Sequence, residues 1–341
     1  MMRAEWCRYR LAFRFEARTS RETMWWKDTY FVRIFDEQEP QKTFGMGECA
    51  LFRGLSADDV PDYEAVLADA CADPLAAIES PYSSIRFGFE TALCERKSTP
   101  WIRGEAGIPI NGLIWMGDKA TMAQRIREKL DAGFKVLKLK IGGINFDDEL
   151  DLLRAIRKEF SVDVLEIRLD ANGSFSPDDA LSRIERLSRY GVHSIEQPIH
   201  AGYPEAMARI CRQSPVAIAL DEELIGYRNA AEAEALVTEI HPQYLILKPA
   251  LCGGFAAADN YIAIAERLGI DWWATSALES NIGLDAIARW LAEKEINMPQ
   301  GLGTGQLYDN NIASPLELRG SALWRDPATS WGDISTLPWQ R

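Results

Sequence analysis

The feature that most constrains the fold is a repeat of apolar runs and amphipathic segments over the last two thirds of the chain. From about residue 107, short apolar runs with polar ends alternate with segments whose apolar residues recur at helical spacing. Residues typical of helix ends flank several of these segments, such as Ser176 before Pro177 and Gly269 after an apolar face. This alternation indicates parallel strands joined by crossover helices.

Eight strands and seven helices are expected in this part. The strands are predicted at 108–115, 134–141, 164–170, 194–197, 216–221, 244–248, 272–276 and, more weakly, 297–302; the helices are predicted at 121–132, 147–160, 177–190, 204–213, 229–240, 255–268 and 282–294. Such a series within about 200 residues predicts a closed TIM-like (β/α)7β barrel. A doubly wound open sheet is the alternative, but no GxGxxG motif follows the first strand.

The first 105 residues show a different, α+β pattern. Strands are predicted at 11–15 and 29–35, a glycine-rich turn at 44–49, and helices at 63–71 and 84–95. The chain therefore divides into an α+β part at 1–105 and a barrel at 106–304, with a remaining segment at 305–341.

Composition excludes several classes of protein. The 341 residues carry a formal net charge of -13, which disfavours a nucleic-acid or anionic-membrane surface. No run of about 18 apolar residues predicts a membrane span, and the charged start lacks the apolar core of a signal peptide. The six cysteines form no CxxC pair, which favours free thiols in a reducing compartment. A cytoplasmic location is expected.

Charged residues recur at the ends of five successive predicted strands. They are Lys140, Asp170, Glu196, Asp221 and Lys248, separated by 30, 26, 25 and 27 residues. Each interval is about one strand–helix unit. In a parallel barrel these positions meet at the carboxyl ends of the strands, where barrel active sites lie.

The three carboxylates predict a metal site. At about 4 Å and an effective dielectric constant near 20, each pair repels by roughly 4 kcal/mol, and a divalent cation removes that repulsion. An all-oxygen set without histidine suits Mg²⁺, with Mn²⁺ as a possible substitute. The alternative for each acid alone is a helix cap or a solvated side chain, but three acids in phase between lysines favour the shared ion.

The lysines indicate proton abstraction next to a carboxylate. A bound substrate carboxylate would have its α-carbon between Lys140 and Lys248, and one lysine would take the proton. Lysine normally titrates near pH 10.4 and needs a pKa of about 7–8 to act as a base. Lys138 shares a strand face with Lys140, so it is expected to tune that pKa together with burial and the ion.

At these residues the sequence resembles the enolase superfamily, in particular its muconate-lactonizing-like branch with a Lys-x-Lys motif. The resemblance implies Lys140 as the catalytic base, Lys248 as the lysine on the opposite face, and Asp170, Glu196 and Asp221 as the metal ligands. It also implies that 1–105 and 305–341 form a capping domain over the barrel. Asn172 and Glu222 match polar residues that support the ligands.

Three segments, 108–114, 275–283 and 301–307, are similar to segments of the o-succinylbenzoate synthase group of this superfamily. The resemblance implies a syn-dehydration of a cyclohexadiene carboxylate through an enediolate, in menaquinone biosynthesis, with a small carboxylate as substrate. Ser276, Gly303 and Gly305 would hold the remote succinyl end. Trp25 and Arg53 are candidates for capping-domain contacts with the substrate.

Other activities remain open at this stage. An N-acylamino-acid racemase or a dipeptide epimerase of the same superfamily would use both lysines for proton exchange, although Gly303-Thr304-Gly305 stands where epimerases have Asp-x-Asp. A Schiff-base lysine aldolase would need no metal. A binding protein with a vestigial site is the alternative outside enzymology.

Overall fold

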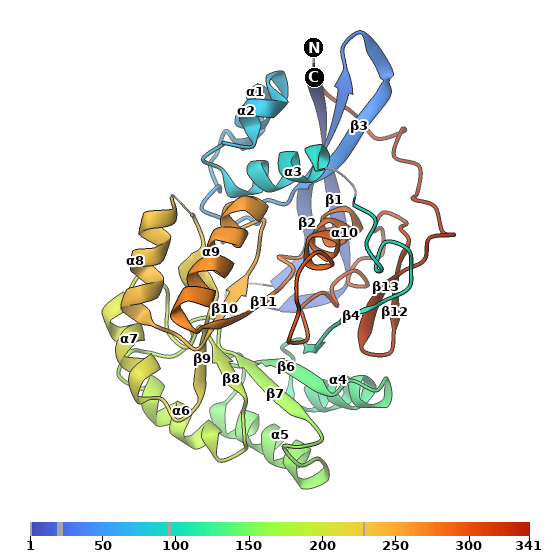
Figure 1. Cartoon of the computed structure of the whole chain (residues 1–341). Coiled ribbons are helices and arrows are strands. Elements are labelled where there is room, and N and C mark those ends of the chain that lie inside the picture. Colours follow the sequence, from blue (N-terminus) through green and yellow to red (C-terminus); the bar gives the residue numbers. More distant parts are fainter. Residues whose placement is uncertain (1, 19–22, 95–96, 228) are drawn as a thin grey trace.

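The computed structural model describes residues 2–18, 23–94, 97–227 and 229–341. At its amino-terminal end lies an antiparallel sheet flanked by helices, drawn in blue and cyan at the top of Figure 1. Its strands, in the order β1-β2-β3, and its helices are β1 (Met2–Arg18), β2 (Thr23–Asp36), β3 (Glu39–Cys49), α1 (Tyr63–Ala72), α2 (Pro74–Ala77) and α3 (Ser83–Leu93). The predicted α+β character is confirmed, and Glu95, the predicted end of α3, lies outside the described residues.

A parallel sheet follows, with strand order β11-β10-β9-β8-β7-β6-β5 and the connecting helices on its outer side (Figure 1). Its strands are β5 (Gly112–Ile114), β6 (Val136–Lys140), β7 (Glu166–Asp170), β8 (Ser194–Glu196), β9 (Ala217–Leu220), β10 (Tyr244–Leu247) and β11 (Asp271–Ala274). The helices are α4 (Lys119–Asp131), α5 (Phe146–Glu159), α6 (Ala180–Ser188), α7 (Pro204–Gln213), the short 3-10 helix η1 (Glu222–Leu224), α8 (Ala230–Ile240), α9 (Gly254–Leu268) and α10 (Asn281–Leu291).

Gln300 and Gly301 close this sheet into a barrel. The Gly301 amide donates to the Ala274 carbonyl at the end of β11 at 2.8 Å, and on the other side the Asn111 amide, directly before β5, donates to the Gln300 carbonyl at 3.0 Å. Single parallel bridges join the pair to both edges of the sheet. The weakly predicted eighth strand thus consists of two bridging residues, and the (β/α)7β barrel is confirmed.

The predicted first strand, 108–115, divides into two strands. β4 (Ile108–Pro109) pairs with β13 (Ala322–Arg325), which pairs with β12 (Leu316–Arg319) in a small antiparallel sheet. Only β5 belongs to the barrel. Periodicity along one continuous apolar run does not reveal that its two halves pair with different partners.

Local signals explain where the helices begin and end. At the start of α5, the Asn145 side chain accepts a hydrogen bond from the Asp147 amide, and acidic residues fill the first turn. At the end of α9, Gly269 adopts φ +68°, a left-handed conformation that suits glycine. The start of α5 and the end of α9 are thus explained by the residues found there.

The carboxyl-terminal segment lies against the amino-terminal sheet. The Trp6 amide donates to the Gln340 carbonyl at 2.9 Å, and the Gln340 amide donates back at 2.7 Å. A second bridge joins Phe13 to Tyr308, and Figure 1 shows the two chain ends close together. These contacts agree with a returning segment at 305–341, and the domain boundaries themselves stay a prediction. In the described residues, no helix combines the length and apolarity needed to cross a membrane.

Candidate active site

Five charged residues stand at or just beyond the carboxyl ends of five consecutive strands. Lys140 ends β6 and is paired in register with Asp170 at the end of β7, which is paired with Glu196 at the end of β8. Asp221 directly follows β9, and Lys248 directly follows β10. β6 and β10 are four strands apart in an eight-membered barrel, so the two lysines approach the rim from opposite sides.

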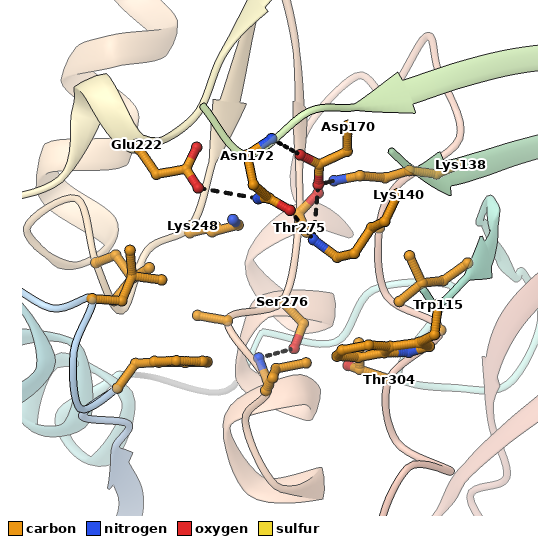
Figure 2. Close-up of a pocket in the computed structure, with 18 of the residues that line it drawn as sticks. Trp115, Lys138, Lys140, Asp170, Asn172, Glu222, Lys248, Thr275, Ser276 and Thr304 are labelled. Atoms are coloured by element: carbon orange, nitrogen blue, oxygen red, sulfur yellow. Dashed lines mark hydrogen bonds and ion pairs between the residues drawn. The ribbon is translucent and has the colours of Figure 1, made fainter. Parts of the chain in front are cut away.

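The lysines and carboxylates lie together in a buried network of charges, and Figure 2 shows the part in which Lys138 and Lys140 contact Asp170. The Lys138 ammonium lies 3.0 Å from Asp170 Oδ2 and 2.7 Å from Glu196 Oε1. The Lys140 ammonium donates to the same Asp170 oxygen at 3.0 Å, and Lys248 donates to Asp221 Oδ2. Because one oxygen of Asp170 accepts from two ammonium groups, Lys138 and Lys140 are coupled through it.

Asn172 extends the network on the Lys140 side. It adopts φ +44°, a left-handed conformation that asparagine tolerates. Its side-chain oxygen accepts from Lys140 Nζ at 2.8 Å, and its amide nitrogen donates to Glu222 Oε1 at 3.1 Å. The structure therefore places the two residues predicted as polar support beside the catalytic candidates.

Gln197, which the sequence analysis missed, orients the Asp221 backbone. Its side chain is fully buried, and its amide oxygen accepts from the backbone amides of Asp221 at 3.1 Å and Glu223 at 3.3 Å. Gln197 also has φ +40°. The signal in the sequence that could have identified Gln197 is its position directly after Glu196, which ends the strand.

Burial and charge act together on the ionisation of the network. Burial raises the pKa of Glu196, and the neighbouring Asp170 and Asp221 carboxylates raise it further. For Lys138, burial opposes the charge, but Asp170, Glu196 and Asp221 outweigh it and raise the pKa. The same balance, with Asp221 as the main carboxylate, raises the pKa of Lys248.

The carboxylates are not arranged around a common point in this structure. Within the described ranges, no set of three histidine, cysteine, aspartate or glutamate side chains could hold a metal ion as it stands. The reason is the position of the ammonium groups, since Lys138 lies against Asp170 and Glu196 while Lys248 lies against Asp221. An ion that bound here would displace Lys138 from two carboxylates.

A cavity of about 360 Å³ opens onto the network. Lys138, Lys140 and Lys248 lie at one end of it in Figure 2, and Trp115, Ser276 and Thr304 lie toward the other. Its apolar wall comes from the barrel and from the loop after β3, namely Phe52, Leu55, Leu113, Leu251 and Leu278. The cavity has the size and the mixed lining of a small-molecule site.

The comparisons with known proteins agree with this geometry. Residues 121–320 match the enolase C-terminal domain-like family. The chain belongs to this family. The o-succinylbenzoate synthase of Desulfotalea psychrophila is 43% identical over 92% of this chain and 96% of its own length.

Solved structures of other proteins share the fold. MenC from Desulfotalea psychrophila superposes with a TM-score of 0.79 and 39% identity, covering 95% of this chain and 99% of that one. The dipeptide epimerase of Cytophaga hutchinsonii, solved with Mg and the dipeptide D-Ala-L-Val, has a TM-score of 0.82 over 98% of this chain and 96% of that one. At 18% identity the latter similarity concerns the fold alone.

Three predicted substrate-binding residues of this enolase-family chain line the cavity, namely Arg53, Ser276 and Gly303. Arg53 is tied down, because its guanidinium donates to Asp59 at 2.6 Å. The Ser276 hydroxyl is also engaged, because it donates to Glu279 and accepts from the Leu278 amide at 3.0 Å. Both side chains therefore form part of the cavity wall, and their donor groups are already engaged within the protein.

Gly305 and Trp25 are not among the residues that line this cavity, and their predicted contacts with the substrate stay predictions. A Cβ at Gly305 would lie 2.8 Å from Asn281 Oδ1 and 3.0 Å from Leu284, so this glycine is required by packing against α10. Trp25 is 56% exposed on β2. In contrast, a Cβ at Gly303 would meet nothing closer than 3.7 Å, so its missing side chain leaves room in the cavity.

Proposed function

We propose that this chain is an o-succinylbenzoate synthase, which dehydrates 2-succinyl-6-hydroxy-2,4-cyclohexadiene-1-carboxylate in menaquinone biosynthesis. The observation that carries the proposal is the approach of Lys140 and Lys248 to one cavity from opposite sides of the barrel, with three buried carboxylates on the strands between them. The near-full-length similarity to a synthase of that name supports this reaction among those of the family.

The carboxylates Asp170, Glu196 and Asp221 are suited to hold Mg²⁺. They supply only oxygen ligands from neighbouring strands, and none is more than 2% exposed. Their three charges are balanced by Lys138, Lys140 and Lys248. A divalent ion, a substrate carboxylate and the loss of one lysine proton together keep that balance. Bound there, the ion would stabilise the second negative charge that develops as the α-proton leaves.

Lys140 acts as the base. It takes the proton from the carbon beside the substrate carboxylate, and it returns that proton to the hydroxyl as the C–O bond breaks on the same face. The electron pair of the C–H bond becomes part of the new aromatic ring, and water is released. Asp170 and Asn172, at 3.0 and 2.8 Å, hold the Lys140 amine in position.

Lys248 remains protonated on the opposite face. Its pKa is raised because the Asp221 and Glu196 carboxylates outweigh the effect of burial. A permanent ammonium there stabilises the negative charge of the intermediate without exchanging a proton. The assignment of Lys140 as base and Lys248 as electrostatic partner is part of this proposal.

Turnover of the cyclohexadiene substrate tests the proposal. Purified protein with Mg²⁺ is expected to produce o-succinylbenzoate, followed by ultraviolet absorbance. Absence of turnover, together with racemisation of N-succinyl amino acids, would instead assign the chain to the racemases of this family. Retention of full activity in EDTA would contradict the role of the metal.

A further inference from the structure

Two exposed glycines follow closely after Lys140. Lys140 ends β6, and Ile141 continues the ladder, because its amide donates to the Asp170 carbonyl at 2.8 Å. Gly142 and Gly143 come next, and both are exposed. Glycine has more conformational freedom than any other residue, so this stretch needs a restraint from another part of the chain if the rim beside Lys140 is to keep one geometry.

Glu149 on α5 supplies this restraint. It is only 3% exposed, and its Oε1 accepts a hydrogen bond from the Gly142 amide at 2.6 Å. Burial raises the pKa of the Glu149 carboxyl group from 4.5 to about 7, while the backbone amides of Gly142, Ile144 and Gly143 favour the charged form and oppose the rise. One carboxylate of the helix therefore interacts with three successive amides of the loop at 142–144.

The buried carboxylate of Glu149 costs free energy of folding that an apolar side chain at this position would not cost. Glu149 has no part in the proposed reaction so far, and it is not among the residues that line the cavity. Leu150, Leu152 and Leu153 of the same helix are buried and already supply apolar packing. The contribution that is specific to a carboxylate here is its hold on the loop amides.

The loop at 142–144 packs against the turn that carries Asn172. A Cβ at Gly142 would lie 2.1 Å from Ser174 Oγ in this turn, so the two segments are in close contact. Asn172 has a left-handed backbone with φ +44°, and its Oδ1 accepts from Lys140 Nζ at 2.8 Å (Figure 2). A shift of the loop would therefore move the residue that holds the Lys140 amine.

We propose that Glu149 is a positioning residue for the base: its carboxylate holds the loop at 142–144 against the turn with Asn172, and so keeps the Lys140 amine aligned with the proton that it removes. This assignment rests on the proposed function, in which Lys140 takes that proton. The walls of the cavity that bind the substrate do not depend on this hold. Its loss therefore lowers kcat and leaves KM nearly unchanged.

Steady-state kinetics with the cyclohexadiene substrate and saturating Mg²⁺ test this role at about pH 8, above the pKa of Glu149. Glu149→Leu is expected to lower kcat by about tenfold or more, because a misplacement of about 1 Å can cost about 10²-fold, while KM stays within about threefold. Its Tm is not expected to fall, because leucine has no charge to bury.

Two further variants serve as controls for Glu149→Leu. Glu149→Gln keeps an oxygen that can accept from the Gly142 amide, and it is expected to recover most of kcat. Asp148→Asn makes the same carboxylate-to-amide change in the same turn of α5, but Asp148 lies against Lys119 at 3.2 Å. Its kcat and KM are expected to equal those of the unsubstituted chain.

A double substitution tests whether Glu149 acts through Asn172. Asn172→Gly removes the side chain, and glycine tolerates the left-handed backbone at this position. This variant is expected to lower kcat. In its background Glu149→Leu is expected to lower kcat by less than about threefold more, because residues that act through one contact are not additive.

The outcomes separate the positioning role from the proposed function. Normal turnover by the unsubstituted chain with an unchanged kcat in Glu149→Leu, or a loss of kcat that accompanies a lower Tm, would overturn the positioning role alone. Full additivity of Glu149→Leu and Asn172→Gly would overturn the path through Asn172. Failure of the unsubstituted chain to turn over the substrate would overturn the proposed function and the positioning role with it.

Discussion

At the scale of single residues, the site depends on the environments of three lysines. All three lysines line the cavity, but Lys138 contacts two carboxylates, whereas Lys140 and Lys248 contact one carboxylate each. A lysine held by two carboxylates retains its proton, so Lys138 serves as a fixed positive charge. A fixed positive charge next to Lys140 disfavours a proton on that amine, so the arrangement is compatible with the expected tuning role of Lys138, which stays a prediction.

Replacement of the base gives the first residue-scale prediction. Lys140→Ala is expected to lower kcat by about 10² to 10⁴-fold, the usual contribution of a general base, while the Tm stays close to that of the unsubstituted chain. The control is Lys135→Ala, since Lys135 precedes the same strand and is exposed. A kcat within a few-fold of the unsubstituted value, measured by absorbance of the product, would remove Lys140 from the mechanism.

The two glycines after the closing residues give a second prediction. Gly303→Ala is expected to fold with a nearly unchanged Tm, because the added Cβ meets no atom closer than 3.7 Å, but to raise KM by filling the cavity. Gly305→Ala is expected to lower the Tm, because its Cβ would lie 2.8 Å from Asn281 Oδ1. Thermal melts and KM values check both; an unchanged KM for Gly303→Ala would contradict the role of this space.

The sequence predicts the charged residues at the strand ends well and the uncharged residues of the cavity wall poorly, for a physical reason. Charges at the ends of successive strands can be counted from their spacing, and spacing alone brings Asp170 and Glu196 side by side. A hydroxyl or an indole after a strand carries no such signal, because its role depends on whether a partner lies nearby. Thr275 and Ser276 adjoin in sequence, yet only Ser276 has hydrogen-bond partners for its hydroxyl.

At the scale of elements, carboxylates of the amino-terminal domain dock onto the starts of two barrel helices. Glu48 accepts hydrogen bonds from the Ser280 and Gly283 amides at the start of α10, both at 2.9 Å. Glu90 on α3 accepts from the Phe255 and Ala256 amides at the start of α9. Helix amino termini favour negative charge, so these contacts fix the domain over the loops that follow β10 and β11.

Glu90 makes the stability of this contact dependent on pH. Burial raises its pKa from 4.5 to about 7, although the two backbone amides oppose the shift. The unfolded chain releases this proton near pH 4.5 and the folded chain near pH 7, so stability falls as the pH rises between these values. Glu90→Gln stays uncharged at every pH. Its free energy of unfolding, compared with that of the unsubstituted chain, is therefore expected to increase over this range by up to about 3 kcal/mol, and its Tm advantage grows with it.

Thermal melts from pH 4 to 8 measure this difference. Glu79→Gln is the control, because the Glu79 side chain is 82% exposed and is expected to show no such trend. If the helix dipole outweighed burial, the Tm difference would shrink with rising pH instead. That result would contradict the assigned pKa direction for Glu90.

Helix and strand positions were predicted more reliably than their ends or partners. Ser176 followed by Pro177 predicts a helix from residue 177, but α6 begins at Ala180. The residues between form a turn, in which Ser176 Oγ accepts a hydrogen bond from the Asp179 amide at 3.1 Å. The division of 108–115 between two sheets depends on strands formed more than 200 residues later. Local patterns contain no information about such distant partners.

At the scale of the whole molecule, the barrel is held closed by contacts between segments that are distant in sequence. Residues 300–301 join both edges of the sheet, and the carboxyl-terminal segment pairs with β1. The amino-terminal domain adds the loop after β3 to the cavity wall through Phe52, Arg53 and Leu55. Substrate access therefore depends on both parts of the chain, whereas the two lysines and three carboxylates at the strand ends belong to the barrel alone.

Binding of Mg²⁺ tests the central claim most directly, because every step at Lys140 and Lys248 assumes an ion among Asp170, Glu196 and Asp221. Calorimetric titration is expected to give one Mg²⁺ per chain. Loss of a residue that supports a metal ligand costs about 10- to 100-fold in metal affinity. Glu196→Gln or Asp221→Asn removes a ligand itself and should weaken Mg²⁺ binding by at least this much. Asp163→Asn, at an exposed position before β7, should leave it unchanged. Failure of the unsubstituted chain to bind Mg²⁺, or equal affinity in all three variants, would contradict the account.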